Sequence, residues 1–561
     1  MPVGSSQQQD LHDQLAKMKR DAEERDAQRR AQGHGHVYLP PEKISVSLDA
    51  LSLLDEHTAR EGHCALIAIK DKKVALVAYD EQYSKTKEVI ARLEKDGYTL
   101  VVYIISLSSL EYALGFYRFV AASRTAISGS VRVGMEDHDV TTVENLDSLP
   151  KVSDAIRANS DAGKISQLME TILMGAIANR ASDIHIEPTQ KGAKIRYRID
   201  GLLNDVYSGL SLALYRPVIS RIKLLSNLKI NIRDEAQDGR FTINLLKKNI
   251  EVRVAIAPSE YGEVAVMRIL DPDAISWQLS DLGIRADDLV IIQDQLKRPN
   301  GMALNTGPTG SGKTTTLYAF LKHRLTSDVK IITIEDPIEY HLEGIEQTQV
   351  DNAANYTFAL GLRSLMRQDP DIILVGEIRD KETAEIAVQA ALTGHLVFST
   401  VHANEAAGGI ARLLDLGVKA NSLAPALNLL IAQRLVRRLC PHCKVAHNDP
   451  DTNKKLQDFI EHLPDRVDKK AYTEHITVFE PKGCEQCNGT GYRGRVGVYE
   501  LLVVTPAIQE LISKNAGQIE ILTEVEKGDF VSMQDDGILK IASGMTTFEE
   551  VEETTGKIIW K

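Results

Sequence analysis

The chain has 561 residues, 43% of them hydrophobic and 26% charged, so it is too long for one hydrophobic core and predicts about three or four domains. Its formal net charge of -12 argues against broad, nonspecific binding to phosphate polymers but leaves room for a local basic groove. We expect a cytoplasmic protein with reduced or metal-bound thiols, because it has no signal-peptide pattern, no run of roughly 18 apolar residues and only five cysteines.

The first part of the chain predicts a tail, a small domain and a linker. Residues 1–36 are polar and densely charged, and we expect a tail with at most a marginal, solvated helix. Between 37 and 125, the segments "CALIAIKDKKVALVAYD", "KTKEVIARLEKDGY" and "TLVVYIIS" read as strand, helix and strand, which predicts an α/β domain. Residues 126–160 are polar and unpatterned, as in a linker.

A second domain is predicted over residues 161–272. It opens with an amphipathic helix, because apolar residues recur at helical spacing from Ile165 to Ala176. Apolar and polar residues then alternate in "SDIHIEP" and "IRYRIDG", and further strands follow in "NIEVRVAIAP" and "EVAVMRIL". After a linker over 273–286, residues 287–561 alternate between helix and strand, which predicts a mostly parallel sheet covered on both faces. The predicted fold class is multidomain α/β.

The third domain carries a phosphate-binding loop. The segment "GPTGSGKT" lies between the apolar "GMAL" and a helical pattern that begins "TTTLYAF". Glycines let backbone N–H groups approach phosphate, Lys313 reaches the outer phosphates and Thr314 ligates Mg²⁺. A glycine-rich turn without nucleotide is the alternative, which the flanking strand and helix disfavour. The candidate nucleotide-binding residues are Gly307, Pro308, Thr309, Gly310, Ser311, Gly312, Lys313, Thr314 and Thr315.

Acidic residues follow two β-branched strands downstream of this loop. Glu335 and Glu339 lie in "KIITIEDPIEY", and Glu377 lies in "DIILVGEIRD". Parallel strands end at the edge of the sheet where ligands bind, and hydrolysis needs carboxylates to hold a metal and orient water. Helix capping is the alternative for any one of these acids. His402, which follows the strand in "TGHLVFSTVHANEA", is a candidate to contact the γ-phosphate.

Four of the five cysteines form two C-x-x-C pairs, in "LCPHCK" and "GCEQCN". Two such pairs supply the four thiolates of a closed, tetrahedral zinc site. A redox dithiol is the alternative, but neither pair has a thioredoxin-like context. We expect Cys64 to be a buried apolar residue and a zinc subdomain over about 436–500. Its predicted ligands are Cys440, Cys443, Cys484 and Cys487.

Together these motifs resemble the secretion ATPase superfamily, and within it the type IV pilus assembly (PilB-like) and type II secretion (GspE-like) ATPases. The similar stretch spans about 160–561 and includes the Walker A loop, "TIEDPIEY", "IILVGEIRD", "GHLVFSTVHAN", "ASDIHIEP", "RYRIDG" and "QDGRF". The resemblance implies a RecA-like P-loop ATPase domain and a PAS-like α+β domain. It further implies a homo-hexamer in which PAS-like domains cover the nucleotide sites and rotate during turnover.

The same resemblance implies roles for individual residues. It makes Glu377 the Walker B acid and Glu339 the base, with Glu335 as the competitor for the base. This Walker B motif ends in glutamate where many P-loop proteins have aspartate. Arginines of the PAS-like domain would compensate charge on the γ-phosphate, which is worth roughly 10³ to 10⁵ in rate; solvent-facing strand arginines are the alternative. The candidates are Arg253, Arg268 and Arg240.

The leading hypothesis is a hexameric ATPase that uses ATP, Mg²⁺ and Zn²⁺ and drives type IV pilus assembly or type II secretion. It would associate peripherally with the inner membrane through a platform protein, and the zinc element marks assembly rather than retraction ATPases. No motif for binding cyclic-di-GMP occurs in residues 1–150.

The alternatives are a nucleotide sensor and a motor for DNA uptake or conjugation, and only a local basic patch favours nucleic acid. That patch comprises Arg434, Arg437, Arg438, Arg493 and Arg495.

Overall fold

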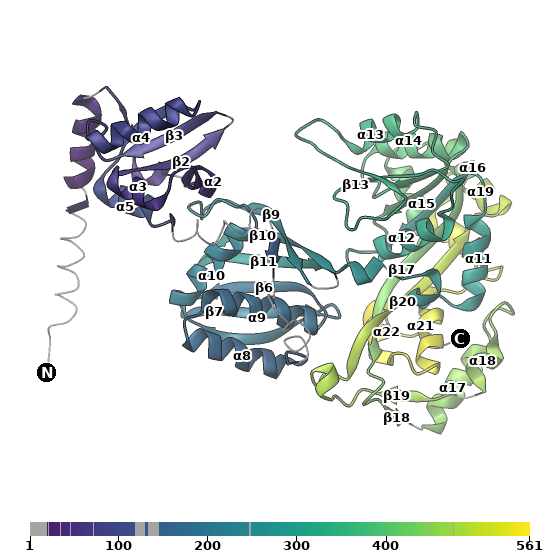
Figure 1. The fold of residues 1–561 in the computed structure, drawn as a ribbon. Coiled ribbons are helices and arrows are strands. Elements are labelled where there is room, and N and C mark those ends of the chain that lie inside the picture. Colours follow the sequence, from purple (N-terminus) through teal and green to yellow (C-terminus); the bar gives the residue numbers. More distant parts are fainter. Residues whose placement is uncertain are drawn as a thin grey trace.

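The structure is a computed structural model. It describes all residues except 1–18, 21, 34, 45, 71, 118–129, 133–144, 246–247, 276, 448, 475 and 561. The described residues build three units around separate sheets, which we call the N-terminal, central and C-terminal units (Figure 1). Much of the linker expected over 126–160 lies outside the described residues. Among the described helices, none has the length and apolarity that a bilayer crossing requires.

The N-terminal unit is a four-stranded sheet in the order β1-β4-β3-β2. Its strands are β1 (Val37–Tyr38), β2 (Cys64–Lys70), β3 (Lys73–Ala78) and β4 (Thr99–Ile104), and its helices are α2 (Leu48–Ser52), α3 (Glu56–Glu61), α4 (Ser84–Lys95) and α5 (Leu107–Leu114). Strands β3 and β4 are parallel because α4 crosses between them, which confirms the predicted strand–helix–strand pattern. Cys64 is fully buried, as predicted.

A helix precedes this sheet where a solvated tail was expected. Residues 22–33 are helical, and Ala27 and Ala31 on one side of the helix are fully buried. Glu24 accepts hydrogen bonds from the hydroxyl groups of Tyr38 and Ser106, both at 2.6 Å. A solvated helix was expected at most, and its packing was not predicted because charged residues dominate the composition, whereas the contact uses two buried alanines and polar side chains such as Glu24.

The central unit is a seven-stranded sheet in the order β5-β9-β10-β11-β6-β7-β8. Its strands are β5 (Ser130–Arg132), β6 (Ala181–Thr189), β7 (Gly192–Ile199), β8 (Leu202–Leu210), β9 (Gln237–Asn244), β10 (Asn249–Ser259) and β11 (Gly262–Leu270). The predicted strands are confirmed. Alternate residues such as Ile184 and Ile186 are buried beneath the helices, so the residues between them occupy the opposite face.

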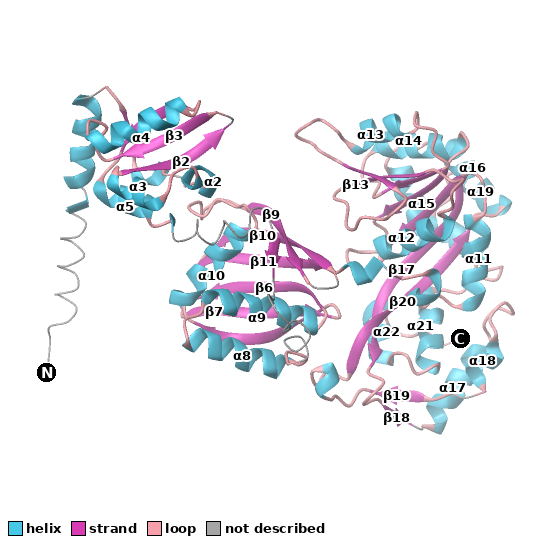
Figure 2. Cartoon of the chain, in the orientation of Figure 1, coloured by secondary structure: helices cyan, strands magenta, loops and turns pink. Residues whose placement is uncertain are grey.

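Helices α8 (Leu149–Asp161), α9 (Ile165–Ala178) and α10 (Leu212–Leu225) cover this sheet (Figure 2). Helix α9 is the predicted amphipathic helix. Helix α8 begins within the segment expected to be a linker. One of its faces is buried, through Val152 and Ile156. The apolar residues of α8 are few, and for this reason the composition of the segment resembled that of a linker.

The C-terminal unit contains a second seven-stranded sheet in the order β14-β13-β15-β16-β12-β17-β20. Its strands are β12 (Gly301–Thr306), β13 (Ile331–Glu335), β14 (Glu346–Gln349), β15 (Ile372–Val375), β16 (Leu396–Val401), β17 (Leu427–Leu439) and β20 (Tyr492–Val503). All neighbouring strands are parallel except β17 and β20. Met302 and Leu304 join one core and Ala303 joins another, which confirms a sheet covered on both faces.

Helices surround this sheet and extend toward the C-terminus. They are α11 (Ala286–Leu296), α12 (Lys313–Arg324), α13 (Phe358–Leu365), α14 (Lys381–Leu392), α15 (Ala406–Asp415), α16 (Ala420–Ala426), α19 (Pro506–Ser513), α20 (Gln518–Val525), α21 (Met533–Ala542) and α22 (Phe548–Thr555). A two-stranded sheet, β18 (Val445–His447) with β19 (Val478–Glu480), lies beside α17 (Pro450–Glu461) and α18 (Lys469–Thr473). Short 3₁₀ helices at Pro272–Ile275 and Leu279–Leu282 lie in the segment between the two large units.

Candidate functional site

The predicted phosphate-binding loop connects β12 to α12 at the carboxyl edge of the large C-terminal sheet. Gly307, Gly310 and Gly312 have φ angles of 145°, 80° and 88°, which only glycine adopts without strain. A Cβ atom on Gly307 would lie 2.5 Å from the carbonyl oxygen of Gln433. Gly312 caps α12, so the positive end of the helix opens onto the loop and provides a site for an anion.

Two side chains of the loop have donors suited to phosphate. Lys313 Nζ donates to the carbonyl oxygens of Gly307 at 2.7 Å and Pro308 at 2.9 Å. Burial lowers the pKa of Lys313, and nearby Glu377 opposes this effect. Ser311 is buried, and among the described residues its Oγ has no hydrogen-bond partner. A buried hydroxyl without a partner is costly, so these residues fit a phosphate ligand.

Gln433 supports the loop from β17 and was not predicted from the sequence. Its Oε1 accepts hydrogen bonds from Asn305 Nδ2 and Thr316 Oγ1, both at 2.8 Å, and all three residues are buried. Gln433 therefore ties the strand before the loop to the helix after it. No motif spacing reveals this role, because the contact depends on β17 lying beside β12.

The two candidate bases at the end of β13 have different surroundings. Glu335 is 4% exposed, and its carboxylate accepts hydrogen bonds from the Tyr318 hydroxyl, from Thr333 Oγ1 at 2.6 Å and from Gln347 Nε2 at 3.1 Å. Burial, and then the charge of Glu335, raise the pKa of Tyr318. Glu339 is more accessible, with 30% of its side chain exposed. Only Glu339 is thus placed to meet water.

Glu377, Lys313 and His402 lie close together, as predicted from their positions after parallel strands. Glu377 Oε2 lies 3.5 Å from His402 Nε2 and 2.5 Å from Arg379 Nε. The negative charge of Glu377 acts on the Lys313 ammonium group. Because β16 lies between β15 and β12, the ends of these three strands bring the acid and the histidine to the phosphate-binding loop.

The three candidate arginines form a row on the central sheet. Arg240, Arg253 and Arg268 are directly opposite one another on β9, β10 and β11. They occupy the face opposite the helices, because their neighbours Val252 and Val254 are buried beneath those helices. Like charges in direct register repel one another, so this face favours an anion.

These arginines have different partners. Arg253 contacts the C-terminal unit: its NH1 donates to Glu339 Oε2 at 2.9 Å and its NH2 donates to the Ile338 carbonyl oxygen. Arg268 Nε donates to Asp183 Oδ1 at 3.0 Å, and the Arg240 side chain is exposed. Arg253 is therefore the arginine that joins the row to the candidate catalytic acids.

The four predicted cysteine ligands converge beside the long β17–β20 hairpin. Their Sγ atoms all lie within 4.8 Å of one another. The Cys440–Cys484, Cys443–Cys487 and Cys484–Cys487 separations are 3.9, 3.8 and 3.7 Å. Zinc–sulfur bonds of about 2.3 Å in a tetrahedron separate the sulfur atoms by about 3.8 Å, so the cluster fits zinc. Cys487 Sγ also accepts N–H groups from Cys484 at 3.1 Å and Gly491 at 3.3 Å, which favours its thiolate.

Comparison with known proteins identifies the family. The family described as Type II/IV secretion system protein matches residues 158–553. The chain belongs to this family. The resemblance stated from the motifs is thereby confirmed, and the match contains most of both large units and all four clustered cysteines.

Individual members of the type II/IV secretion system protein family are similar over most of their length. "Type II secretion system protein E" of Aeromonas hydrophila is 43% identical over 430 residues, which cover 76% of this chain and 83% of that protein. "Type IV pilus assembly ATPase PilB" of Myxococcus xanthus is 40% identical over 462 residues, which cover 82% and 78%. The solved structure of the Yersinia pseudotuberculosis ATPase DotB has a TM-score of 0.50 at 23% identity, over 70% of this chain and 93% of that one, and so shares its fold.

Proposed function

We propose that this chain is a P-loop ATPase that works as a hexameric motor in type IV pilus assembly or type II secretion. The observation that carries the proposal is the contact of Arg253 with Glu339, which follows β13 in the sheet that carries the phosphate-binding loop. The contact joins an arginine of the central unit to a carboxylate of the C-terminal unit. A hydrolase whose turnover depends on movement between two domains needs a contact of this kind. Relatives named as ATPases of pilus assembly and type II secretion support the assignment.

In the proposed site, the chain's own groups bind and orient the nucleotide. Lys313 would exchange its two carbonyl partners for phosphate oxygens, and the loop N–H groups and Ser311 would hold the remaining oxygens. Thr314 and Glu377 would hold Mg²⁺, which neutralises developing charge on the phosphates when bound. His402 would contact the γ-phosphate from its position beside Glu377.

Glu339 is the proposed base, and Glu335 is a structural acid. Both oxygens of Glu335 accept hydrogen bonds from buried or half-buried donors that join β13 to α12 and β14. While Arg253 holds Glu339, its guanidinium group occupies the carboxylate oxygen that a water molecule would otherwise contact. Transfer of Arg253 to the γ-phosphate would free Glu339, so that charge compensation and base activation occur together. Arg268 and Arg240 would then complete the arginine face.

The proposal includes the domain division and the partners. We propose a tail over 1–36, a small domain over 37–125, a PAS-like domain that includes α8 and extends to 272, a linker over 273–286 and a RecA-like domain over 287–561 with a zinc subdomain at about 436–500. The motor would act in the cytoplasm on an inner-membrane platform protein. Zinc would be structural, because four cysteines leave no open position for a substrate.

Arg434 and Arg437 of the basic patch have partners within the protein, which disfavours the competing function on nucleic acid. Of the arginines near the cysteines, Arg437 is engaged by Glu550 at 2.8 Å and stacks 4.1 Å over the ring of Tyr492. Arg434 donates to Asn404 Oδ1 at 3.0 Å. Arginines engaged in this way stabilise the protein and are not available as a phosphate groove.

The test is the steady-state ATPase rate of the purified chain with Mg²⁺ and Zn²⁺, together with its mass by analytical ultracentrifugation. We expect nucleotide-dependent hexamers and a rate that Lys313→Ala abolishes and that DNA does not change. Strong stimulation by DNA that weakens steeply with salt would replace the proposal with a nucleic-acid motor. Absence of turnover in any oligomeric state would refute the ATPase assignment.

A further inference from the structure

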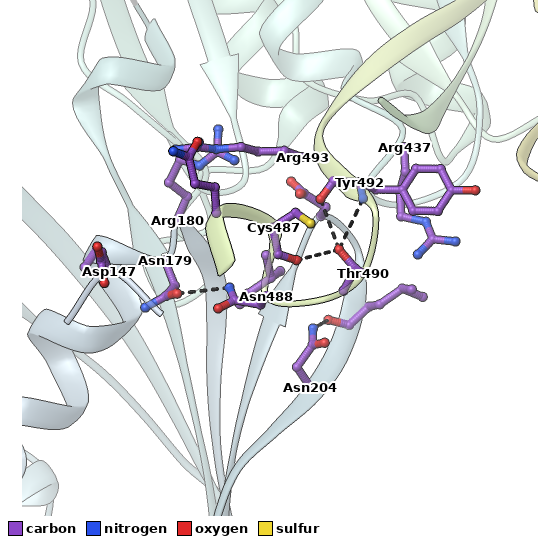
Figure 3. A pocket seen from close by; sticks show the side chains of 15 residues that line it. Asp147, Asn179, Arg180, Asn204, Arg437, Cys487, Asn488, Thr490, Tyr492 and Arg493 are labelled. Atoms are coloured by element: carbon purple, nitrogen blue, oxygen red, sulfur yellow. Dashed lines mark hydrogen bonds between the residues drawn. The ribbon is translucent and has the colours of Figure 1, made fainter. Parts of the chain in front are cut away.

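The segment that carries the second cysteine pair contacts the central unit. We call residues 484–494 the knuckle loop. A cavity lies where this loop meets the central sheet, with Asn179 and Asn204 on the sheet side and Asn488, Thr490 and Arg493 on the loop side (Figure 3). Three hydrogen bonds connect the two units around the cavity. Nothing in the proposed hydrolysis uses these contacts.

Asn488 of the knuckle loop makes two of the three bonds. Its Oδ1 accepts the backbone N–H of Leu149 at 2.9 Å, and Leu149 is the first residue of α8. The residue that should cap α8 is Ser148, but its side chain makes no capping hydrogen bond. Helix starts need an acceptor for their exposed N–H groups. Asn488 therefore supplies from another unit the cap that the helix lacks locally.

The second bond of Asn488 reaches a side chain with a fixed orientation. Asn488 Nδ2 donates to Asn179 Oδ1 at 3.1 Å, as Figure 3 shows. Asn179 is buried, and its Nδ2 donates to the carbonyl oxygens of Leu146 and Gly175, both at 2.8 Å. Because these carbonyls occupy both N–H groups of Asn179, only its acceptor oxygen is left to face Asn488. The two amides are thus matched as donor and acceptor.

The third bond joins a tight turn to the start of β20. Asp200, between β7 and β8, accepts the backbone N–H of Gly494 at 2.7 Å through Oδ2. Both residues have left-handed backbones, with φ angles of 49° and 81°. The contact lies beside the edge strand β8, with three strands between β8 and the strand that carries Arg253.

The cysteine pair controls the shape of the knuckle loop. Asn488 directly follows Cys487 and has a φ angle of 52°, a left-handed conformation that asparagine tolerates. Cys487 Sγ accepts the N–H groups of Cys484 and Gly491, on either side of Asn488 in the chain. The sulfur atom therefore holds the backbone that presents the Asn488 amide.

We propose that the knuckle loop is the docking surface for the central unit, and that the metal held by the four cysteines sets the position of that unit. The docking bonds stand independently, whereas the metal dependence rests on the proposed zinc site. The central unit is then attached to the C-terminal unit at two places, through Arg253 and Glu339 and through the knuckle loop. Nucleotide would rearrange the first attachment while the second acts as a pivot.

Hydrogen exchange of the full chain, followed by mass spectrometry, tests the docking. Asn488→Gly removes both side-chain bonds and keeps a residue suited to a positive φ angle. We expect exchange in the peptide over residues 146–156 to rise about five- to tenfold, as for loss of a helix cap, with zinc content unchanged. The matched control is Asn515→Gly, because Asn515 is exposed with a φ angle of 56°. Unchanged exchange over 146–156 in Asn488→Gly would overturn the proposal.

A variant on the opposite side gives an independent readout. Asp200→Gly suits the φ angle of 49° and removes the acceptor for Gly494, so exchange should rise over residues 492–496. In the wild-type chain, chelation of zinc should raise exchange over 146–156 as Asn488→Gly does. Zinc loss without such a rise would overturn the metal dependence. A chain purified without zinc would refute the zinc site, while the two variants would still decide the docking.

Discussion

Arg253 NH1 lies 2.9 Å from Glu339 Oε2, so an arginine of the central sheet forms an ion pair with the accessible acid that follows β13. The pair joins two units that are otherwise built around separate sheets. Partly exposed ion pairs of this kind contribute little stability, so the pair can exchange partners at low cost. A polyphosphate at the loop is a stronger partner for the guanidinium group than a single carboxylate.

The two acids at the end of β13 should respond differently to removal of their charge. Glu339→Gln should lower the ATPase rate by about 10² to 10⁴ while nucleotide affinity is retained, since a general base is lost. Glu335→Gln should instead lower the free energy of unfolding by about 1–3 kcal/mol, because an amide places a donor against buried donors. Turnover rates, nucleotide titrations and denaturant unfolding of both variants check this. Normal turnover in Glu339→Gln would contradict the assignment.

Gln433 should prove necessary for the shape of the phosphate-binding loop. Gln433→Leu leaves the buried Asn305 and Thr316 donors without an acceptor, and each should cost about 1–3 kcal/mol of unfolding free energy. The affinity for nucleotide should fall as well, because the loop loses its link to β17. The control is Gln457→Leu on the surface of α17. Equal thermal stability and nucleotide affinity in the two variants would disprove the supporting role.

Zinc should be required for folding of the segment that connects β17 to β20. Cys443→Ser should remove bound zinc and lower the thermal unfolding temperature, because binding energies of about 10–16 kcal/mol are available from zinc in small domains. Cys64→Ala, in the N-terminal unit, should keep one zinc per chain. Zinc content by atomic emission and calorimetry give the result. Full zinc in Cys443→Ser would refute the four-cysteine site.

Glu500 should make the chain more stable in mild acid than at neutral pH. Burial raises the pKa of Glu500 to about 6, although the N–H groups of Ala406 and Met533 oppose the shift. The folded state then holds a proton that the unfolded state releases, so the unfolding free energy falls as pH rises from about 4.5 through 6. The expected change from this group is about 2 kcal/mol. Denaturant unfolding at pH 5 and pH 7 should show about 1.2 kcal/mol of this change in the wild type and lose it in Glu500→Gln. Identical pH dependence in both proteins would be evidence against it.

Local patterns predicted most of the candidate site. Glycine spacing, alternation along strands and paired cysteines depend on neighbours in the chain, so the phosphate-binding loop, Glu377 and the cysteine cluster were all accessible from the sequence. Gln433 and Asn488 were not, because their roles arise from strands and loops that meet only in the folded chain. The packing of the helix at 22–33 was not predicted for a related reason: its buried residues, Ala27 and Ala31, are few and small.

The row formed by Arg240, Arg253 and Arg268 has a consequence for ligand choice. Each of these cations raises the free energy of its neighbours in the apo protein, and a bound anion relieves this repulsion in proportion to its charge. A nucleoside triphosphate carries more charge toward this face than a diphosphate. In the proposed ATPase, the arginine row would therefore favour the triphosphate over the diphosphate through its charge, in addition to the contact proposed for His402.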